Sequence, residues 1–516
     1  MPPPLPEDLT VQLTRRTFLG AAALAAIAAP AACGDGSGGG GERLRVAFPG
    51  GGSRESLDPH VVPQFVDQAR AKACFDTLTG WTQSMTAEPR LAEVVEPDAT
   101  GARWRIRLRE ATWHDGRPLT PDDVLSTFRR IADPATTASA ASLFGGIDFA
   151  ASRAAGPRDV EIVLGAPDFT FPLWLGAPGT EIVPAGTTGF GAPVGTGPFR
   201  FVSFEPGGTA VYVRNDAYWD GPAPSPELEF VPIDDEQARL GALLSGQVAY
   251  AHDLRPASAR QIEQQAGRAT LLTAPQSTSQ FLNLRIDRPP FSDPRVREAV
   301  RIGIDREALV RIVLLGTGQV GNDLFGGPDL QYYPSDAPRT TRDVERARAL
   351  LREARATDTT VELQTSGSDP NFQPAANLVA EQLTEIGLRA TPRVLDSATY
   401  FSAVRESGVA SFTRTGTLPI PDFIGRRRLS SADNSNYTGY RSTEIDRLYA
   451  EAVADPDEDA RAANLGRIQA MLRADSGALV WATSNWNVGI AAGVTGIAAA
   501  KPNSHLWGRF DRAAAG

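Results

Sequence analysis

The segment at residues 103–130 restricts the fold more than any other part of the chain. Residues 103–109, Arg-Trp-Arg-Ile-Arg-Leu-Arg, alternate strictly between arginine and apolar side chains, which is typical of a half-buried strand with a solvated basic face. Thr120 can cap a helix, Pro121 suits a first turn, and the two aspartates that follow suit the helix dipole. The segment therefore predicts a strand, a turn and then a helix.

Similar signals continue along the chain and favour an α/β fold. A first strand is expected at residues 43–48, and residues 150–235 hold short strand-like runs separated by Gly and Pro. In the second half, helices and strands alternate. The expected elements there are helices that begin at Asp293 and Asp305, helices at 342–354 and 373–386, a strand at 388–395, helical residues 443–474 and a strand at 478–490.

The length and composition describe a multi-lobed globular protein. At about 150 residues per domain, 516 residues predict about three lobes. The 42% of hydrophobic residues is ordinary for a folded protein, and no stretch approaches the roughly 20 apolar residues of a spanning helix. The formal net charge of −10 argues against nucleic acid as the main partner. Nearly all positive charge is arginine, because the chain has only two lysines, Lys72 and Lys501.

The N-terminus has the pattern of an export signal. Arg15-Arg16 is followed by an apolar run at residues 19–32, which as a helix would span only about 21 Å and is too short to cross a membrane. The arginine pair resembles a twin-arginine signal. Residues 1–32 are therefore predicted to be a signal peptide.

Cys33 follows the apolar run and is the first residue of a Gly-rich tether at residues 33–42. Ala-Ala-Cys-Gly resembles a bacterial lipobox, in which the cysteine becomes a lipid-carrying N-terminus, although Pro30 stands where that motif usually has an aliphatic residue. The alternative is a plain cleavable signal with an incidental cysteine. Without Cys33 only Cys74 remains, so no disulfide can form within the mature chain, and Cys74 is expected to be a buried, inert thiol.

Catalytic and metal-binding motifs are missing from the sequence. Residues 316–321 match G-x-G-x-x-G, but a helix is expected before them where a dinucleotide site needs a strand. The sequence contains no phosphate-binding loop, nucleophile elbow or H-E-x-x-H motif. The four histidines lie far apart, without metal-ligand neighbours at helical spacing. We therefore expect no metal, no cofactor and no enzymatic activity.

Five ordered motifs carry a resemblance to a known family. They are Ser56-Leu57-Asp58-Pro59, the stretch Trp104 to Arg130, Pro193 to Phe199 (PVGTGPF), Arg214 to Trp219 (RNDAYW), and Pro289 to Arg297 (PPFSDPRVR), which continues to Ile304-Asp305-Arg306. Together they resemble the oligopeptide/dipeptide/nickel-type solute-binding proteins of ABC importers, family 5. The resemblance covers about residues 43–510. The motif residues themselves make turns and helix caps, so they identify the family and do not mark the ligand site.

The resemblance implies a two-lobed, periplasmic-binding-protein-like α/β fold (type II, cluster C) with an extra β-rich subdomain in the first lobe. Lobe I is expected at 43–274 and 483–516, with the insert at about 60–190, and lobe II at 275–482. Such proteins close on a ligand between the lobes. The implied function is an extracytoplasmic receptor, monomeric, at the outer face of the cytoplasmic membrane or in the periplasm, which delivers a peptide or peptide-like solute to an ABC permease.

One departure from the family pattern concerns the ligand. In the family's peptide binders, an aspartate in a D-x-x-D-P-like segment anchors the amino terminus of the ligand, and Thr417 stands at that position here. A neutral hydroxyl cannot pair with an ammonium group as a carboxylate does. Either Asp422 substitutes from a shifted position, or the ligand has no free amino terminus, or the alignment slips at Pro419 and Pro421.

Further lining residues are expected from segments that border the cleft in the family. They are Gln64, Phe65, His252, Asp253, Gln280, Thr415 and Trp481. For Phe65 and Trp481 the alternative is core packing, and for His252 it is a satisfied loop histidine. A second functional hypothesis keeps the same fold and assigns it a non-peptide specialised metabolite or a sugar, as carrier or sensor.

Overall fold

The computed structural model describes residues 43–515 except 51, 53–54, 62–63, 266, 368, 398 and 432–435. The strand and helix predicted at residues 103–130 are confirmed as β5 (Arg103–Leu108) and α2 (Pro121–Ala132). Thr120 and Asp123 form a reciprocal capping box at the start of α2, and its apolar side faces the core. The predicted signal peptide, Cys33 and the tether lie outside the described residues.

Ten strands follow one another in the order β15-β14-β16-β12-β17-β11-β1-β10-β9-β8 across the large sheet, and an eleventh, β13, pairs with β17. Their bounds are β1 (Leu44–Phe48), β8 (Phe199–Ser203), β9 (Ala210–Arg214), β10 (Glu227–Pro232), β11 (Tyr250–Ala251), β12 (Ala269–Leu284), β13 (Gly318–Val320), β14 (Thr360–Ser366), β15 (Arg389–Leu395), β16 (Ala410–Gly416) and β17 (Ala478–Ala491).

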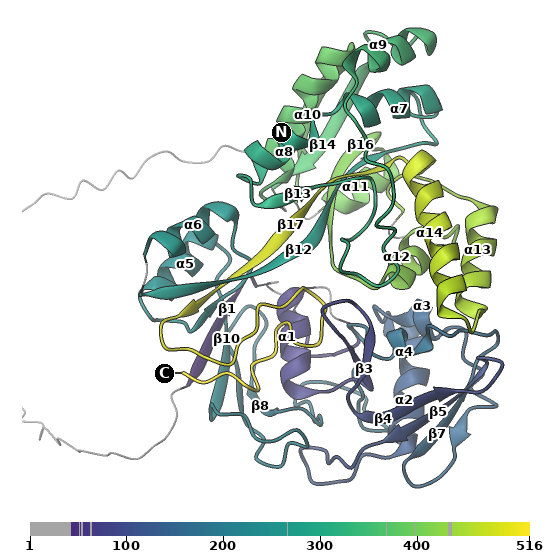
Figure 1. The fold of residues 1–516 in the computed structure, drawn as a ribbon. Helices are drawn as coiled ribbons and strands as arrows, with labels where there is room; N and C mark the ends of the chain where they lie inside the picture. The colour runs from purple at the N-terminus through teal and green to yellow at the C-terminus, as the bar shows by residue number, and fades with distance from the viewer. Residues whose placement is uncertain are drawn as a thin grey trace, which may run out of the picture. The chain divides into compact units, whose positions relative to one another are not determined.

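Two long antiparallel strands, β12 and β17, join the two ends of this sheet (Figure 1). Their pairing runs from Ala269 opposite Ala491 to Asn283 opposite Ala478, and it shifts register between Ala274 and Thr278. Gln276 lies in this interruption with a φ of 49°, which a residue with a Cβ adopts only at a sharp bend. The interruption falls at the predicted boundary between lobes, and that boundary stays a prediction.

A separate four-stranded sheet lies within the range predicted for the inserted subdomain. Its order is β4-β5-β7-β6, and a hairpin precedes it. The strands are β2 (Thr79–Trp81), β3 (Ala87–Pro89), β4 (Ala92–Pro97), β6 (Arg153–Ala154) and β7 (Asp159–Val163). The short helices α3 (Ala141–Phe144) and α4 (Phe171–Trp174) and the 3-10 turn η2 (Pro134–Thr136) belong to the same part of the chain. The β-rich expectation for residues 150–235 is thus confirmed for the strands, although residues 175–198 form no strand.

The helices expected in the second half are present, within one or two residues of their predicted bounds. Asp293 and Asp305 cap α7 and α8 with their side chains, and Gly387 ends α10 at a φ of 108°. The remaining helices are α1 (Phe65–Cys74), α5 (Glu236–Leu244), α6 (Pro256–Gln264), α7 (Pro294–Gly303), α8 (Arg306–Val313), α9 (Val344–Glu353), α10 (Phe372–Ile386), α11 (Tyr400–Glu406), α12 (Ile420–Arg427), α13 (Thr443–Ala454) and α14 (Glu458–Asp475). No helix among the described residues is long and apolar enough to span a membrane.

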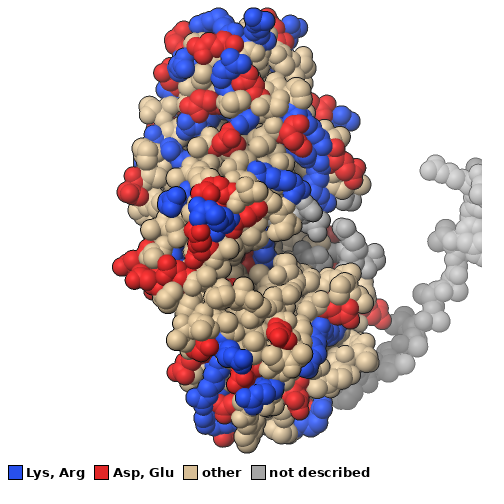
Figure 2. All heavy atoms as spheres, turned by 90° about the vertical axis from the view of Figure 1, so that its right-hand side faces the viewer, with Lys and Arg blue, Asp and Glu red and all other residues tan. Residues whose placement is uncertain are grey.

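The hydrophobic core has several separate clusters. One packs α7, α8, α9 and α10 against β12, β14 and β16, and another packs β1, β9 and β10 against α1 and the C-terminal segment. The largest cluster combines the inserted sheet and α2 with α12, α13 and α14. On the face shown in Figure 2, acidic and basic side chains are interspersed, so that face has no extended basic surface of the kind that nucleic-acid binding needs.

The Gly195-Thr196-Gly197 motif packs directly on the end of α1, which explains its glycines. A Cβ on Gly195 would lie 1.8 Å from the carbonyl oxygen of Cys74, and one on Gly197 would lie 2.5 Å from the Cys74 carbonyl carbon. Cys74 itself is buried and unpaired, and burial raises the pKa of its thiol far above the ordinary value. The burial that the sequence predicts for this thiol is therefore confirmed.

Candidate functional site

A cavity of about 360 Å³ lies where segments from both predicted lobes meet. Ligand sites commonly have volumes of about 300–1,000 Å³. The charged side chains of its lining are four carboxylates, Asp234, Asp235, Glu236 and Asp253, and three guanidinium groups, Arg239, Arg255 and Arg414. Neutral groups complete the wall, including Thr317, Asn371, Ser484 and Asn485. The cavity can therefore offer both acceptors and donors to a ligand.

The start of α5 holds one wall of this cavity in place. Asp235 caps α5 by accepting from the amide of Ala238. Arg239, one turn later, donates to the carbonyl oxygens of Ile233 at 2.7 Å and His252 at 2.9 Å. Because Arg239 is 3% exposed and ties two loops together, it orders the wall and has little surface left for a ligand.

Arg414 is the central charge of the cavity. This β16 residue pairs with Asp253 at 2.8 Å and with Asp369 at 2.7 Å, so one cation lies between two carboxylates. Burial alone would raise the pKa of Asp253, but the neighbouring Arg414 outweighs it and holds that pKa below the ordinary value. Burial dominates at Asp369, which is 3% exposed, and raises its pKa despite Arg414. The three groups carry one excess negative charge when all are ionised.

An aromatic cluster borders Asp253. The rings of Phe65, His252, Trp486 and Trp507 lie with centroids 5.1–5.7 Å apart, and His252 also stacks on Phe48 at 4.2 Å. The Arg414 guanidinium lies 5.5 Å from the Trp486 ring centroid, which joins the cluster to the ion pairs. Burial lowers the pKa of His252 to about 3, so this imidazole is neutral at pH 7.

Three predicted residues lie at these two features, and Gln64, Gln280 and Thr415 are not among the residues that line the cavity. Phe65 and His252 belong to the aromatic cluster, and Asp253 lines the cavity. Gln64, at the start of α1, forms a capping box with Asp67. Gln280 lies opposite Arg414 in the β12–β16 ladder and donates to Ser484 Oγ at 3.0 Å, while Thr415 lies opposite Ser279.

The polar groups of Thr417 form hydrogen bonds with other residues of the protein. Its hydroxyl donates to the Ser277 carbonyl oxygen at 2.7 Å, and its backbone amide donates to the same oxygen. The Thr417 carbonyl oxygen in turn accepts from Asn503 at 2.9 Å. The side chain is 3% exposed. These contacts order the end of β16.

Asp422 and Trp481 are placed in buried surroundings. Asp422 is fully buried in α12 and pairs with Arg426 at 2.7 Å, one helical turn away. Trp481, 1% exposed, packs in the core cluster of the second-half helices. The structure thus places Trp481 in the core-packing environment that the sequence left open as an alternative.

Sequence reasoning missed Arg414 and Asp369, which form the ion pairs of the cavity. Arg414 had a local signal, because it is the only charged residue in the neutral strand β16. Asp369 follows the end of β14 and carries no comparable signal. Among the described residues, no group of three or more His, Cys, Asp or Glu side chains is arranged to hold a metal ion.

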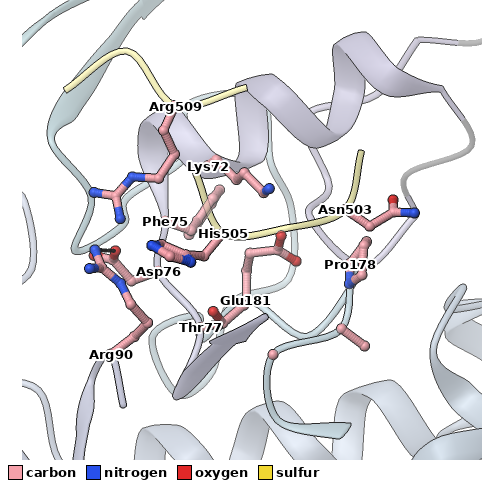
Figure 3. A pocket seen from close by; sticks show the side chains of 13 residues that line it. Lys72, Phe75, Asp76, Thr77, Arg90, Pro178, Glu181, Asn503, His505 and Arg509 are labelled. Atoms are coloured by element: carbon pink, nitrogen blue, oxygen red, sulfur yellow. Dashed lines mark ion pairs between the residues drawn. The ribbon is translucent and has the colours of Figure 1, made fainter. Parts of the chain in front are cut away.

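A second, smaller cavity of about 40 Å³ lies beside α1 (Figure 3). Lys72 points toward the C-terminal segment here and donates to the carbonyl oxygens of Ser504 at 2.8 Å and Trp507 at 2.9 Å. Burial lowers the pKa of Lys72 to about 7 and raises that of Glu181, on the opposite wall, to about 7. The volume suits a few water molecules and no larger ligand.

The long shared strands, the inserted sheet and the cavity between two sets of elements define a two-lobed binding protein. Comparison with known families agrees. The model of bacterial extracellular solute-binding proteins, family 5 (middle), matches residues 86–424, more than half of the chain. The chain belongs to this family of solute-binding proteins.

Relatives and solved structures agree with this assignment. Glutathione-binding protein GsiB of Escherichia coli (strain K12) is 26% identical over 437 residues, which cover 80% of this chain and 84% of the relative. AgaA of A. tumefaciens R10, solved with agropinic acid, has a TM-score of 0.79 at 23% identity and covers 92% of this chain and 99% of its own. DppA of Helicobacter pylori, solved with the peptide STSA, has a TM-score of 0.78 at 19% identity, with 91% and 98% covered. These structures share the fold.

Proposed function

We propose that this chain is an exported, lipid-anchored receptor that captures a peptide or peptide-like ligand between its two lobes and delivers it to the permease of an ABC importer. It binds the ligand without chemical turnover. Family membership supports the receptor role, and the names of relatives that bind glutathione or peptides support the ligand class.

The observation that carries the ligand class is the mixed charge of the 360 Å³ cavity. A peptide is a zwitterion with a backbone of alternating donors and acceptors. Carboxylates and guanidinium groups that converge from two lobes suit both ends of such a molecule, because a buried ligand charge needs a paired partner. The excess negative charge around Arg414 suits the amino end.

Asp253 is the stronger candidate for the amino-group anchor. It lines the cavity, and its side chain is 27% exposed, so a ligand ammonium can reach it. Asp422 is fully buried and already paired with Arg426. Thr417 has no charge to offer. We therefore assign the anchor to Asp253, with Asp369 beside it.

The first test is native mass spectrometry of the protein purified from its native host, to identify any co-purified ligand. The second is calorimetric titration with dialanine, N-acetyl-dialanine and glutathione. We expect an unmodified peptide to bind and its N-acetylated form to bind at least about tenfold more weakly, since acetylation removes the ammonium. Asp253→Asn should cause a similar loss.

Two further variants make this test decisive. Asp358→Asn removes an exposed carboxylate that is not among the residues lining the cavity and should leave the affinity unchanged. If Asp422→Asn abolishes binding while Asp253→Asn has no effect, the anchor assignment is wrong. If neither unmodified peptide nor glutathione binds and the co-purified mass is not a peptide, the peptide assignment itself fails.

The second candidate function keeps the receptor role and replaces the peptide by a non-peptide specialised metabolite or a sugar. Thr417 favours it, since the position that is acidic in peptide binders is neutral here and its hydroxyl is used internally. A non-peptide mass in the native spectrum would select this function.

Export and anchoring form a separate part of the proposal. They rest on the Arg15-Arg16 pair, the apolar run and Cys33, all outside the described residues. Labelled palmitate should be incorporated into the wild-type chain and not into Cys33→Ser, and the lipidated form should fractionate with membranes. A Cys33→Ser chain that still carries the label would refute anchoring through this cysteine.

A further inference from the structure

The C-terminal segment at residues 501–505 contacts both predicted lobes. It follows β17 and returns across α1 (Figures 1 and 3). The only two lysines of the chain meet at it, Lys501 within it and Lys72 from α1. An ammonium group is a compact charge with three donors, which suits it to binding several backbone carbonyls at one point.

On the lobe I side, the segment is held by short hydrogen bonds. The amide of His505 donates to the Trp81 carbonyl oxygen at 2.7 Å, and the amide of Lys501 donates to Gln83 Oε1 at 2.9 Å. Lys72 Nζ donates to the Ser504 carbonyl oxygen at 2.8 Å. All these partners lie at residues 72–83, so this attachment does not depend on lobe II.

Two side chains of the segment, those of Lys501 and Asn503, contact residues of lobe II. Lys501 Nζ forms an ion pair with Asp329, and Asn503 Nδ2 donates to the Thr417 carbonyl oxygen at 2.9 Å. The Lys501 side chain is 4% exposed, whereas that of Asp329 is 53% exposed. Asn503 has a φ of 69°, the left-handed conformation that asparagine tolerates better than most residues. The backbone at this point is thus turned to present the Asn503 amide to β16.

We propose that residues 501–505 are a latch that holds the two lobes in the closed arrangement. When the lobes separate, the segment stays on lobe I, because Lys72, Trp81 and Gln83 retain it there. The contacts to Asp329 and Thr417 must then break. The latch therefore biases the equilibrium between open and closed forms, and a receptor biased toward closure releases its ligand more slowly.

The latch lies apart from the ion pairs of the cavity and involves other residues. The Arg414–Asp253 pair also joins the predicted lobes, but a ligand charge can compete for it directly. Lys501 and Asp329 are not among the residues that line the 360 Å³ cavity. Substitutions in the latch therefore alter closure without altering the groups that face the ligand there.

The test uses the ligand-free full chain and needs no knowledge of the ligand. Lys501→Gln, Asp329→Asn and Asn503→Ala are compared with wild type by small-angle X-ray scattering. We expect each variant to raise the ratio of open to closed molecules about three- to tenfold, seen as a larger radius of gyration. Glu345→Gln, which removes one charge from an exposed pair within lobe II, is the matched control and should leave the radius of gyration unchanged.

Two further measurements separate a latch from ordinary structural support. Hydrogen exchange at the His505 amide should stay as slow as in wild type in Lys501→Gln and become faster in Lys72→Gln, since only the latter removes one of the contacts that hold the segment on lobe I. Combining Lys501→Asp with Asp329→Lys should restore the wild-type radius. An unchanged radius in all three single variants, or fast exchange at His505 in Lys501→Gln, would overturn the latch. If the protein failed to bind peptides, the proposed function would be wrong, but the latch proposal would still stand.

Discussion

Thr417 and Arg414 have different surroundings, although they are only three residues apart. The backbone around it continues β16 and pairs with β12, but its hydroxyl donates to Ser277 and takes no charge to the cavity. Arg414, three residues earlier, forms ion pairs with Asp253 and Asp369. At the residue scale, a neutral side chain bonded within the protein and a charged, ion-paired side chain therefore lie three residues apart, and the amino-group anchor at Asp253 stays a proposal.

Glu181 provides a prediction for the pH dependence of stability. Burial raises its pKa from 4.5 to about 7, against the opposing effect of Lys72. Between pH 4.5 and 7 the unfolded chain releases this proton while the folded chain keeps it, so the stability contribution falls as the pH rises through that window. Glu181→Gln should raise the free energy of unfolding at pH 7.5 by about 2 kcal/mol, and by nearly nothing below pH 4.5.

Chemical denaturation at pH 4.5, 6 and 7.5 measures this difference. Glu110→Gln is the control, because Glu110 is 87% exposed and its substitution removes a carboxylate from the surface and not from the interior. A Glu181→Gln variant with equal stability gains at all three pH values would show that Glu181 keeps an ordinary pKa.

At the element scale, the molecule depends on close backbone contacts between elements that are distant in sequence. The turn before β8 packs its glycines onto the last residues of α1, and Gly197 donates its amide to the Cys74 carbonyl oxygen at 2.9 Å. A motif that identifies the family therefore serves packing, as its glycines predict.

Gly197→Ala should destabilise the protein by about 3 kcal/mol or more, because the new methyl group would meet the backbone of Cys74 and Phe75 at 2.5–2.7 Å. Gly191→Ala has no atom within 4 Å of the added carbon and should change the melting temperature by less than about 1 °C. Thermal unfolding of both variants measures the difference. Equal melting temperatures would contradict the close packing described here.

At the scale of the whole molecule, the ion pair between Arg414 and Asp253 connects the two predicted lobes, and Asp369 adds a second carboxylate from the same predicted lobe as Arg414. Removing the cation leaves two carboxylates, one of them almost fully buried, without their partner. Arg414→Gln should therefore lower the free energy of unfolding by about 3 kcal/mol at pH 7.5. The loss should shrink at pH 5, where Asp369 takes up a proton more readily.

Urea unfolding at the two pH values tests this expectation. Arg393→Gln, which breaks an exposed pair on β15, should cost no more than about 0.5 kcal/mol at either pH. If both substitutions cost the same, the Arg414 pairs contribute no more than surface contacts and do not stabilise closure.

The elements of this fold were predictable because they depend on local chemistry. The alternation at residues 103–109, the capping box at Thr120 and the glycine that ends α10 each act within a few residues, so a single sequence reveals them. The order of the motifs was enough to indicate the family. The candidate site was only partly predictable. Asp253 lines the candidate cavity, and Phe65 and His252 lie in the aromatic cluster beside it, whereas Asp369 gave no local signal.

The parts of the fold and of the candidate site that the sequence did not predict depend on contacts between distant segments. Asp253 and Arg414 are 161 residues apart, and Lys501 and Asp329 are 172 apart. Only the folded chain decides that Arg414 lies between two carboxylates, that Asp422 is fully buried, and that the two lysines meet at one segment. Charge and burial at each of these places are properties of surroundings assembled from several elements, and no spacing along the sequence encodes them.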